Sequence, residues 1–426
     1  MLGSLISVTA KLFDDFERTN PRPRGHEESV FSFLNRVDQP FWQRIREELE
    51  RWYADYPDEQ RGFDLRQRFR RPEPAQHFGA WWELYLHRLF RCLGFGVEVE
   101  PEVPGGKPDF RVTRDSDSFL MEATTSFSGI VDEERHPKRE AAVLAAIDQA
   151  RNPSFTVGLE IQQVGDEQPS VPEIVGPLEH WLSGLNPDDE LERDIFDAPQ
   201  CLLDVRGWKL LLTAFALRPE ARGKPDHRLL GMGPGMSGYV NDREQLVAAL
   251  IGKRRKYKPE EPFVLAVLMM SSGLVDHEDV EAALLGTVAY PVLPERGLGP
   301  PFRQSDGFWR GGDSPRGTRV SAVLTGDNLV AENVARTWPR LWPNPWAARP
   351  LTVRSAVPSR RRDSTASRVV RGSCWHFTFD TWAPSGLAWP RQALLEALDN
   401  ELDDEEQELR ALEQSASSSN RRSRRC

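Results

Sequence analysis

The stretch that decides the fold is GKPDFRVTRDSDSFLMEAT, residues 106–124. Two short runs within it, PDFRVT at 108–113 and FLMEAT at 119–124, have the turn-forming residues 114–117 between them. This pattern predicts two strands joined by a turn. Before them, VEVEPEV at 97–103 alternates apolar and acidic residues with a period of two and leads into a Pro-Gly-Gly turn, which predicts a further, half-buried strand.

Helices are predicted on both sides of this three-strand meander. Residues 78–93 (FGAWWELYLHRLFRCL) form a strong apolar run that Gly94 closes, which is typical of a largely buried helix. After the meander, KREAAVLAAIDQA at 138–150 predicts a second helix and SFTVGLEIQ at 154–162 a fourth strand. A helix, three strands, a helix and a strand together predict an α/β fold: an α/β/α sandwich with a mixed sheet.

Other elements flank this core. The spacing of apolar residues at 40–56 predicts an amphipathic helix, whereas the basic run RGFDLRQRFRRP at 61–72 is interpreted as a solvated loop or helix end. FVLAVLMM at 263–270 is nearly continuous in apolar residues, as in a strand buried on both faces. Further helices are predicted around 175–185, 241–257 and 277–285, and further strands at 208–217 and 319–325.

Length and composition limit the class of protein. The 426 residues suggest about two to three domains, and 55 Lys and Arg against 65 Asp and Glu give a net charge of −10. No apolar run approaches the roughly 18 residues of a membrane-spanning helix, and the start of the chain lacks the basic region and cleavage site of a secretion signal. The four cysteines are far apart, which favours reduced thiols over disulfides or zinc sites. We therefore expect a cytoplasmic protein without a membrane partner.

Changes in composition predict the domain organisation. A helical segment precedes the sandwich core, which contains an insertion, and irregular, Arg-rich, acidic and Ser-rich stretches follow it. The predicted boundaries are an N-terminal helical segment at 1–75, the core at 76–290, a Gly/Pro/Trp-rich region at 291–358, an Arg-rich linker at 359–373, a strand and acidic helix at 374–414, and a disordered tail at 415–426.

Three acidic residues stand out by their placement. Glu83 lies in the buried helix, Asp109 begins the second strand of the meander, and Glu122 lies in the third. On antiparallel neighbours, facing Cβ atoms are about 4.5–5.5 Å apart. Two carboxylates so close repel each other unless a cation or a shared proton neutralises them. Oxygen ligands at this spacing suit Mg²⁺ or Mn²⁺, and such an ion can polarise a phosphodiester.

At these residues the chain resembles the PD-(D/E)xK, restriction-endonuclease-like nuclease superfamily. The matching elements are Glu83 on a helix, Pro108-Asp109 opening a strand, and Glu122 on the next strand after a gap of twelve residues. Lys253-x-x-x-Tyr257 before an apolar strand is similar to a helix motif of some branches. The resemblance covers 76–162 well and 241–270 less well. It implies a restriction-endonuclease-like core and a Mg²⁺-dependent nuclease with metal ligands at Asp109, Glu122 and Glu83. The whole chain also resembles a group of uncharacterised bacterial proteins with the same pattern, which implies no activity.

One departure from the family pattern bears on catalysis. The family has a lysine two residues after the glutamate, where its ammonium positions or activates the attacking water, but this chain has Thr124 there. The chain contains only eight lysines. Lys107, two residues before Asp109, and Lys253 are the candidates for a catalytic lysine that has moved. A site without any catalytic lysine is the third possibility.

The partner expected from the resemblance is nucleic acid, DNA more than RNA. A chain with a net charge of −10 has no global field that attracts nucleic acid, although local arginine runs can form a groove. Two functions therefore stay open. One is a metal-dependent nuclease that hydrolyses phosphodiester bonds; the other is a catalytically degenerate protein of the same fold that acts as a nucleic-acid-binding or scaffold module. A third possibility is an unrelated α/β binding protein. The sequence does not indicate an oligomeric state.

Overall fold

The computed structural model describes residues 11–57, 59–128, 137–191, 193, 197–223, 228–232, 242–254, 257, 259–271, 277–293, 297–311, 314–334, 337–351 and 375–376. The chain divides into two compact units. Unit 1 comprises 1–20, 34–129 and 241–426, and unit 2 comprises 21–33 and 130–240. Among the described residues, no helix is long and apolar enough to cross a membrane.

Unit 1 is built on a mixed sheet. Its first three strands form an antiparallel meander, the third runs parallel to the two central strands, and the following strands are antiparallel again. The order is β1 (Gly96–Val99), β2 (Phe110–Arg114), β3 (Asp117–Ser128), β8 (Phe263–Ser271), β15 (Ala322–Asp327), β16 (Arg340–Pro343) and β17 (Trp375–His376).

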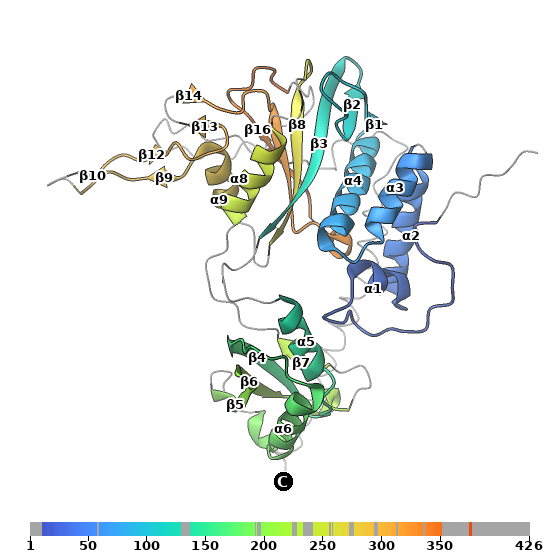
Figure 1. The fold of residues 1–426 in the computed structure, drawn as a ribbon, viewed down its shortest axis with the longest axis vertical. Coiled ribbons are helices and arrows are strands. Elements are labelled where there is room, and N and C mark those ends of the chain that lie inside the picture. Colours follow the sequence, from blue (N-terminus) through green and yellow to red (C-terminus); the bar gives the residue numbers. More distant parts are fainter. Residues whose placement is uncertain are drawn as a thin grey trace, which may run out of the picture. The chain divides into compact units, whose positions relative to one another are not determined.

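Helices lie on both sides of this sheet, as Figure 1 shows. The N-terminal helices are on one side, where the Trp82 indole donates to the carbonyl oxygen of Ala266 at 3.1 Å. Gly326 allows this approach, because a Cβ there would lie 2.9 Å from the Trp82 ring. The first side carries α2 (Pro40–Ala54), α3 (Glu59–Phe69) and α4 (Pro74–Cys92), and the other carries α8 (Asp242–Lys253) and α9 (His277–Leu285).

The other described elements of unit 1 are short, and α1 (Val30–Arg36) includes the point at which the chain passes from unit 2 to unit 1. A helix near the N-terminus, three two-stranded ribbons after α9 and one turn of 3₁₀ helix are all brief. They are α1 (Val30–Arg36), β9 (Val288–Ala289) with β12 (Phe302–Arg303), β10 (Val292–Leu293) with β11 (Gly297–Leu298), β13 (Arg310–Gly311) with β14 (Ser314–Pro315), and η3 (Ala331–Asn333).

Unit 2 has a sheet and a core of its own. Leu178 of its second helix and Val157 and Leu210 of its strands belong to one buried cluster. The strand order is β5 (Gln200–Val205), β6 (Trp208–Ala216), β4 (Phe155–Gln163) and β7 (Leu230–Met232); the helices are α5 (Pro137–Ile147), α6 (Val171–Ser183), α7 (Pro187–Glu190) and the 3₁₀ turn η2 (Pro219–Ala221).

The structure confirms the meander and its preceding helix and corrects the rest of the predicted core. The helix and strand predicted at 138–150 and 154–162 exist as α5 and β4, but they belong to unit 2. The strand that pairs with β3 is β8, preceded by α8. Residues 263–269 of β8 are all buried, which is what a central strand covered on both faces requires. Both candidate strands have suitable local sequences, so only long-range packing decides between them.

Further predictions concern the segments before and after the predicted core. The basic run at 61–72 is wrongly interpreted as a loop or helix end: most of it forms α3, because Leu65 and Phe69, one turn apart, are both fully buried. The described part of the Gly/Pro/Trp-rich region at 291–358 contains the strands β10 to β16, of which only β15 and β16 are longer than two residues. The Arg-rich linker, the acidic helix and the disordered tail lie outside the described residues.

Candidate functional site

Strand register places Asp109 and Glu122 on the same face of the sheet. Phe110 lies opposite Met121, so the next pair along the antiparallel ladder is Asp109 and Glu122. Because β2 begins only at Phe110, the backbone of β3 loses this neighbour beyond Met121. The Ala123 N–H instead donates to Asp109 Oδ2 at 2.6 Å. The carboxylate of Asp109 is therefore held where the two strands separate.

Glu122 is fully buried and accepts hydrogen bonds from two residues of unit 1 that follow unit 2 in the chain. Lys253 Nζ, at the end of α8, lies 2.7 Å from Glu122 Oε1. The Tyr257 hydroxyl lies 2.8 Å from Glu122 Oε2 and 2.7 Å from the carbonyl oxygen of Lys107. A phenol has one proton, so these two acceptors share it. Gly106 gives the ring its space, because a Cβ there would lie 2.9 Å from it.

Glu83 is held by an arginine from the neighbouring helix. The guanidinium of Arg68 on α3 donates through Nη1 and Nη2 to the two carboxylate oxygens of Glu83, at 2.7 and 2.6 Å. This two-point pairing is the strong geometry for Arg and carboxylate. Its hydrogen bonds raise the pKa of Arg68. The pKa of the nearby Tyr56 is raised well above its usual value, mainly by burial and next by the charge of Glu83.

The electrostatics single out Asp109. Burial, with the charges of Glu83 and then Glu122, raises the pKa of Asp109 to about 8, although the Ala123 N–H and Lys253 oppose the shift. Burial and then the hydrogen bond to Glu122 also raise the pKa of Tyr257. The Asp109 carboxyl therefore binds a proton more tightly than a free aspartate does, and a cation bound at the same place would compete with that proton.

The predicted site residues divide into two groups. The structure brings together Asp109, Glu122 and Lys253, with Glu83 close enough to affect the pKa of Asp109. It does not bring Lys107 to them: Lys107 Nζ pairs with the exposed Glu102 at 3.1 Å, and its own side chain is 52% exposed. Lys107 contributes only its carbonyl oxygen, through Tyr257.

Sequence reasoning missed Arg68. It lies fifteen residues before Glu83, in a run where five of eleven residues are arginines. No local signal marks which of these arginines faces the carboxylates. The helical spacing of Leu65 and Phe69 was the available clue, since it sets the buried face of α3 and so the direction of Arg68.

The three predicted metal ligands differ in how their oxygens are engaged. Among the described residues, no group of three His, Cys, Asp or Glu side chains is arranged to hold a metal ion. Both oxygens of Glu83 are engaged by Arg68. Asp109 and Glu122 remain as a facing pair of carboxylates, and each of their oxygens has a second lone pair. Mg²⁺ is commonly held in proteins by one or two carboxylates together with substrate phosphates.

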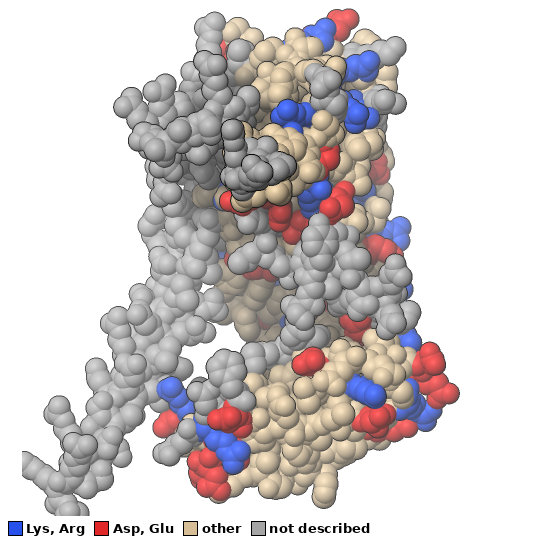
Figure 2. Space-filling model, turned by 90° about the vertical axis from the view of Figure 1, so that its left-hand side faces the viewer, with Lys and Arg blue, Asp and Glu red and all other residues tan. Residues whose placement is uncertain are grey.

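The surface charge gives no sign of a broad basic groove on the face that Figure 2 shows. There, the described lysines and arginines are interspersed with aspartates and glutamates in both units. This mixed surface agrees with the net charge of −10. A strong electrostatic attraction for nucleic acid would require a concentrated basic patch.

Comparison with known proteins adds no relative. No protein-family model, no curated protein and no solved structure matches the chain.

Proposed function

We propose that this protein is a metal-dependent phosphodiesterase of the restriction-endonuclease-like class that acts on nucleic acid, DNA in preference to RNA. The observation that carries the proposal is the 2.7 Å contact between Lys253 Nζ and Glu122 Oε1, on the same sheet face as Asp109. The element order of unit 1, α4-β1-β2-β3-α8-β8, supports it. The lysine that Thr124 replaces on the strand is supplied here by the end of a helix.

Each side chain has a distinct role in this proposal. The Lys253 ammonium places a positive charge next to the carboxylates, where it orients the attacking water or balances charge that develops on the phosphate. Asp109 and Glu122 would hold Mg²⁺ or Mn²⁺, which polarises the phosphodiester when it is bound. Tyr257 fixes the orientation of Glu122. Arg68 fixes Glu83, so in this arrangement Glu83 supplies negative charge rather than a metal ligand.

A degenerate, non-cleaving protein of the same fold is the second candidate. The observation that favours it is the saturation of the carboxylates: Arg68 occupies both oxygens of Glu83, and Lys253 and Tyr257 occupy those of Glu122. In that case the cluster is a buried network that supports the fold, and the protein binds nucleic acid or acts as a scaffold without cutting.

Cleavage assays separate the two functions. Labelled single- and double-stranded DNA and RNA are incubated with the natural chain and Mg²⁺, Mn²⁺ or EDTA. We expect metal-dependent cleavage, with a loss of about 100-fold or more in Lys253→Gln, the scale of a positioned proton-transfer or charge-stabilising group. Lys107→Gln is the matched control, since it removes the same charge from an exposed pair, and should retain activity within about twofold.

The opposite results are equally informative. Full cleavage by Lys253→Gln would contradict the role of this lysine. A natural chain that does not cleave, but that gains metal-dependent cleavage with Thr124→Lys, would identify the degenerate protein. Absence of cleavage in both, with no binding to any of the nucleic acids, would contradict the nuclease and the nucleic-acid-binding module and leave only the scaffold.

A further inference from the structure

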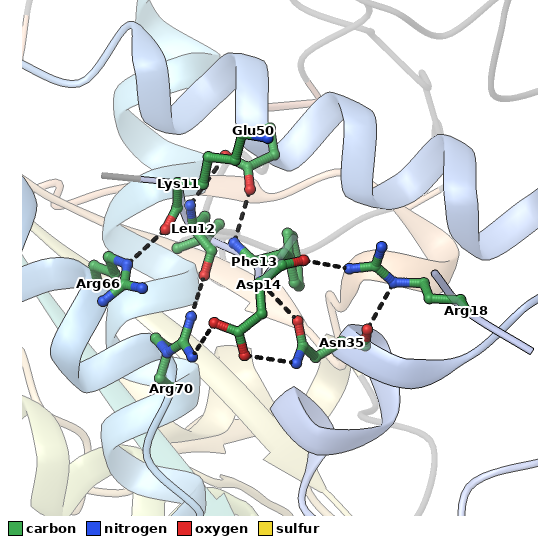
Figure 3. Close-up of polar contacts among 9 residues, drawn as sticks. All are labelled: Lys11, Leu12, Phe13, Asp14, Arg18, Asn35, Glu50, Arg66 and Arg70. Carbon is green, nitrogen blue, oxygen red and sulfur yellow. Dashed lines mark hydrogen bonds and ion pairs between the residues drawn. The ribbon is translucent and has the colours of Figure 1, made fainter. Parts of the chain in front are cut away.

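A short segment near the N-terminus is bound like a peptide ligand. Figure 3 shows side chains that accept hydrogen bonds from the N–H groups of Leu12, Phe13 and Asp14. The Glu50 carboxylate accepts from the N–H of Leu12 at 3.0 Å and of Phe13 at 2.7 Å. Asn35 Oδ1 accepts from the Asp14 N–H at 2.9 Å. One carboxylate on α2 and one amide on α1 thus bind three consecutive backbone donors.

The carbonyl groups of the segment are bound in the same way from α3. Arg66 Nε donates to the Lys11 oxygen at 2.6 Å, and Arg70 Nη1, just after the helix end, donates to the Leu12 oxygen at 3.0 Å. These hydrogen bonds come from side chains of other elements. Residues 11–14 belong to no helix or strand. In folded proteins about two-thirds of the hydrogen bonds join two backbone groups, and most of the remainder join a side chain to the backbone, as here.

Three side chains of the segment specify its sequence. Leu12 is fully buried and Phe13 is 4% exposed. The Phe13 ring packs edge-on against Phe69 of α3, with 6.0 Å between ring centroids. The Asp14 carboxylate accepts from Arg70 Nη2 at 2.7 Å and from Asn35 Nδ2 at 2.9 Å. Backbone recognition combined with two apolar anchors and one acidic contact is the usual composition of a peptide-binding groove.

The groove continues past the segment as an open hollow of about 720 Å³. Its walls are charged, and Arg46, one of the lining residues, is buried, with its Nη1 donating to two backbone carbonyls at 2.9 and 2.8 Å. A longer peptide therefore has space beside the anchors. Helix α3 also presents Arg68 to Glu83, so a peptide in this groove would contact the helix that holds one of the candidate site's carboxylates.

We propose that the groove formed by Asn35, Glu50, Arg66, Phe69 and Arg70 is a binding site for an extended Leu-Phe-Asp peptide, and that residues 11–14 occupy it as a displaceable intramolecular ligand. The contacts do not depend on the covalent connection of the segment to the chain. A partner protein that presents two large apolar residues followed by Asp, in extended form, makes the same contacts in its place. Binding in the groove does not depend on the proposed nuclease function.

The test uses the full chain with its own segment released. Leu12→Ser/Phe13→Ser removes both anchors and leaves every groove residue intact. A fluorescein-labelled peptide of residues 9–18 is titrated with the natural chain and with this variant, and its anisotropy is measured. We expect the variant to bind the peptide at least about 100-fold more tightly, because in the natural chain the tethered segment competes at an effective concentration in the millimolar range. A peptide with Ser in place of its Leu and Phe is the control and should not bind.

A groove variant shows where the peptide binds. Adding Arg70→Ala to the released variant removes the donor to Leu12 and to Asp14, so peptide affinity should fall by at least about tenfold. Equal binding to the natural chain and the released variant, or no effect of Arg70→Ala, would overturn the proposal. So would the absence of binding to a folded released variant, with a natural circular dichroism spectrum, at peptide concentrations up to about 1 mM.

Folding of the released variant is addressed by a second measurement. If the variant is unfolded or partly folded, its thermal unfolding is followed with and without excess peptide. A ligand that binds only the folded state raises the melting temperature, so the natural peptide should restore folding or raise the melting temperature, whereas the Ser-substituted peptide should not. A natural peptide without effect in this measurement would also overturn the proposal.

Discussion

Replacing Lys253 by Met should destabilise unit 1 through the charge that it leaves behind. The Glu122 side chain is 1% exposed, and Lys253 Nζ pairs with its Oε1 at 2.7 Å. Removing one member of a fully buried ion pair costs about 3–5 kcal/mol. The Lys253 side chain is 31% exposed, so water screens part of this interaction, and Tyr257 still donates to Glu122. We therefore expect a loss of about 1–3 kcal/mol in the free energy of unfolding.

Urea unfolding at pH 7, followed by tryptophan fluorescence, measures this loss. Lys107→Met is the matched control, because its exposed pair with Glu102 should contribute less than about 1 kcal/mol. The double variant Lys253→Met/Glu122→Gln should recover at least half of the lost stability, since it also removes the negative charge of the buried carboxylate. Equal losses in Lys253→Met and Lys107→Met, or no recovery in the double variant, would refute the assignment of Lys253 as the partner of a buried Glu122.

Three further perturbations test other parts of the structure. The pKa of Asp109 in the folded chain is about 8, above its value of about 3.9 in the unfolded chain, so the folded state binds the proton more tightly and stability should fall as pH rises from about 4 to about 8. Asp109→Asn should remove this slope from urea midpoints measured across that range, and parallel profiles would contradict the pKa shift. Mn²⁺ should raise the melting temperature of the natural chain but not of Asp109→Asn; equal shifts would exclude a metal site here. Glu50→Gln should cost about 1–2 kcal/mol in urea unfolding, because its carboxylate binds two backbone N–H groups, whereas Glu47→Gln, whose carboxylate accepts from the exposed Gln43, should cost almost nothing; similar losses would argue against a tightly held N-terminal segment.

The local pattern of residues 97–124 was sufficient to predict the meander. A period of two, a turn between the strands and the position of Asp109 at the beginning of its predicted strand together predict that Asp109 and Glu122 face each other. Strand periodicity and turn chemistry act over a few residues, so they can be read from the sequence directly. The same holds for the buried helix α4, whose apolar run places Glu83 near the sheet.

Tertiary structure decided which distant segments complete the site. The lysine on Glu122 comes from 131 residues further along the chain, after the whole of unit 2, and the sequence left Lys107 and Lys253 as equal candidates. Strands β4 and β8 were both suitable neighbours for β3, and β8, which is buried over residues 263–269, is the strand that pairs with it. Such choices depend on which apolar faces exclude water best when the chain packs, and on which charges that packing brings together. Both are properties of long-range contacts, which periodicity within a single segment does not contain.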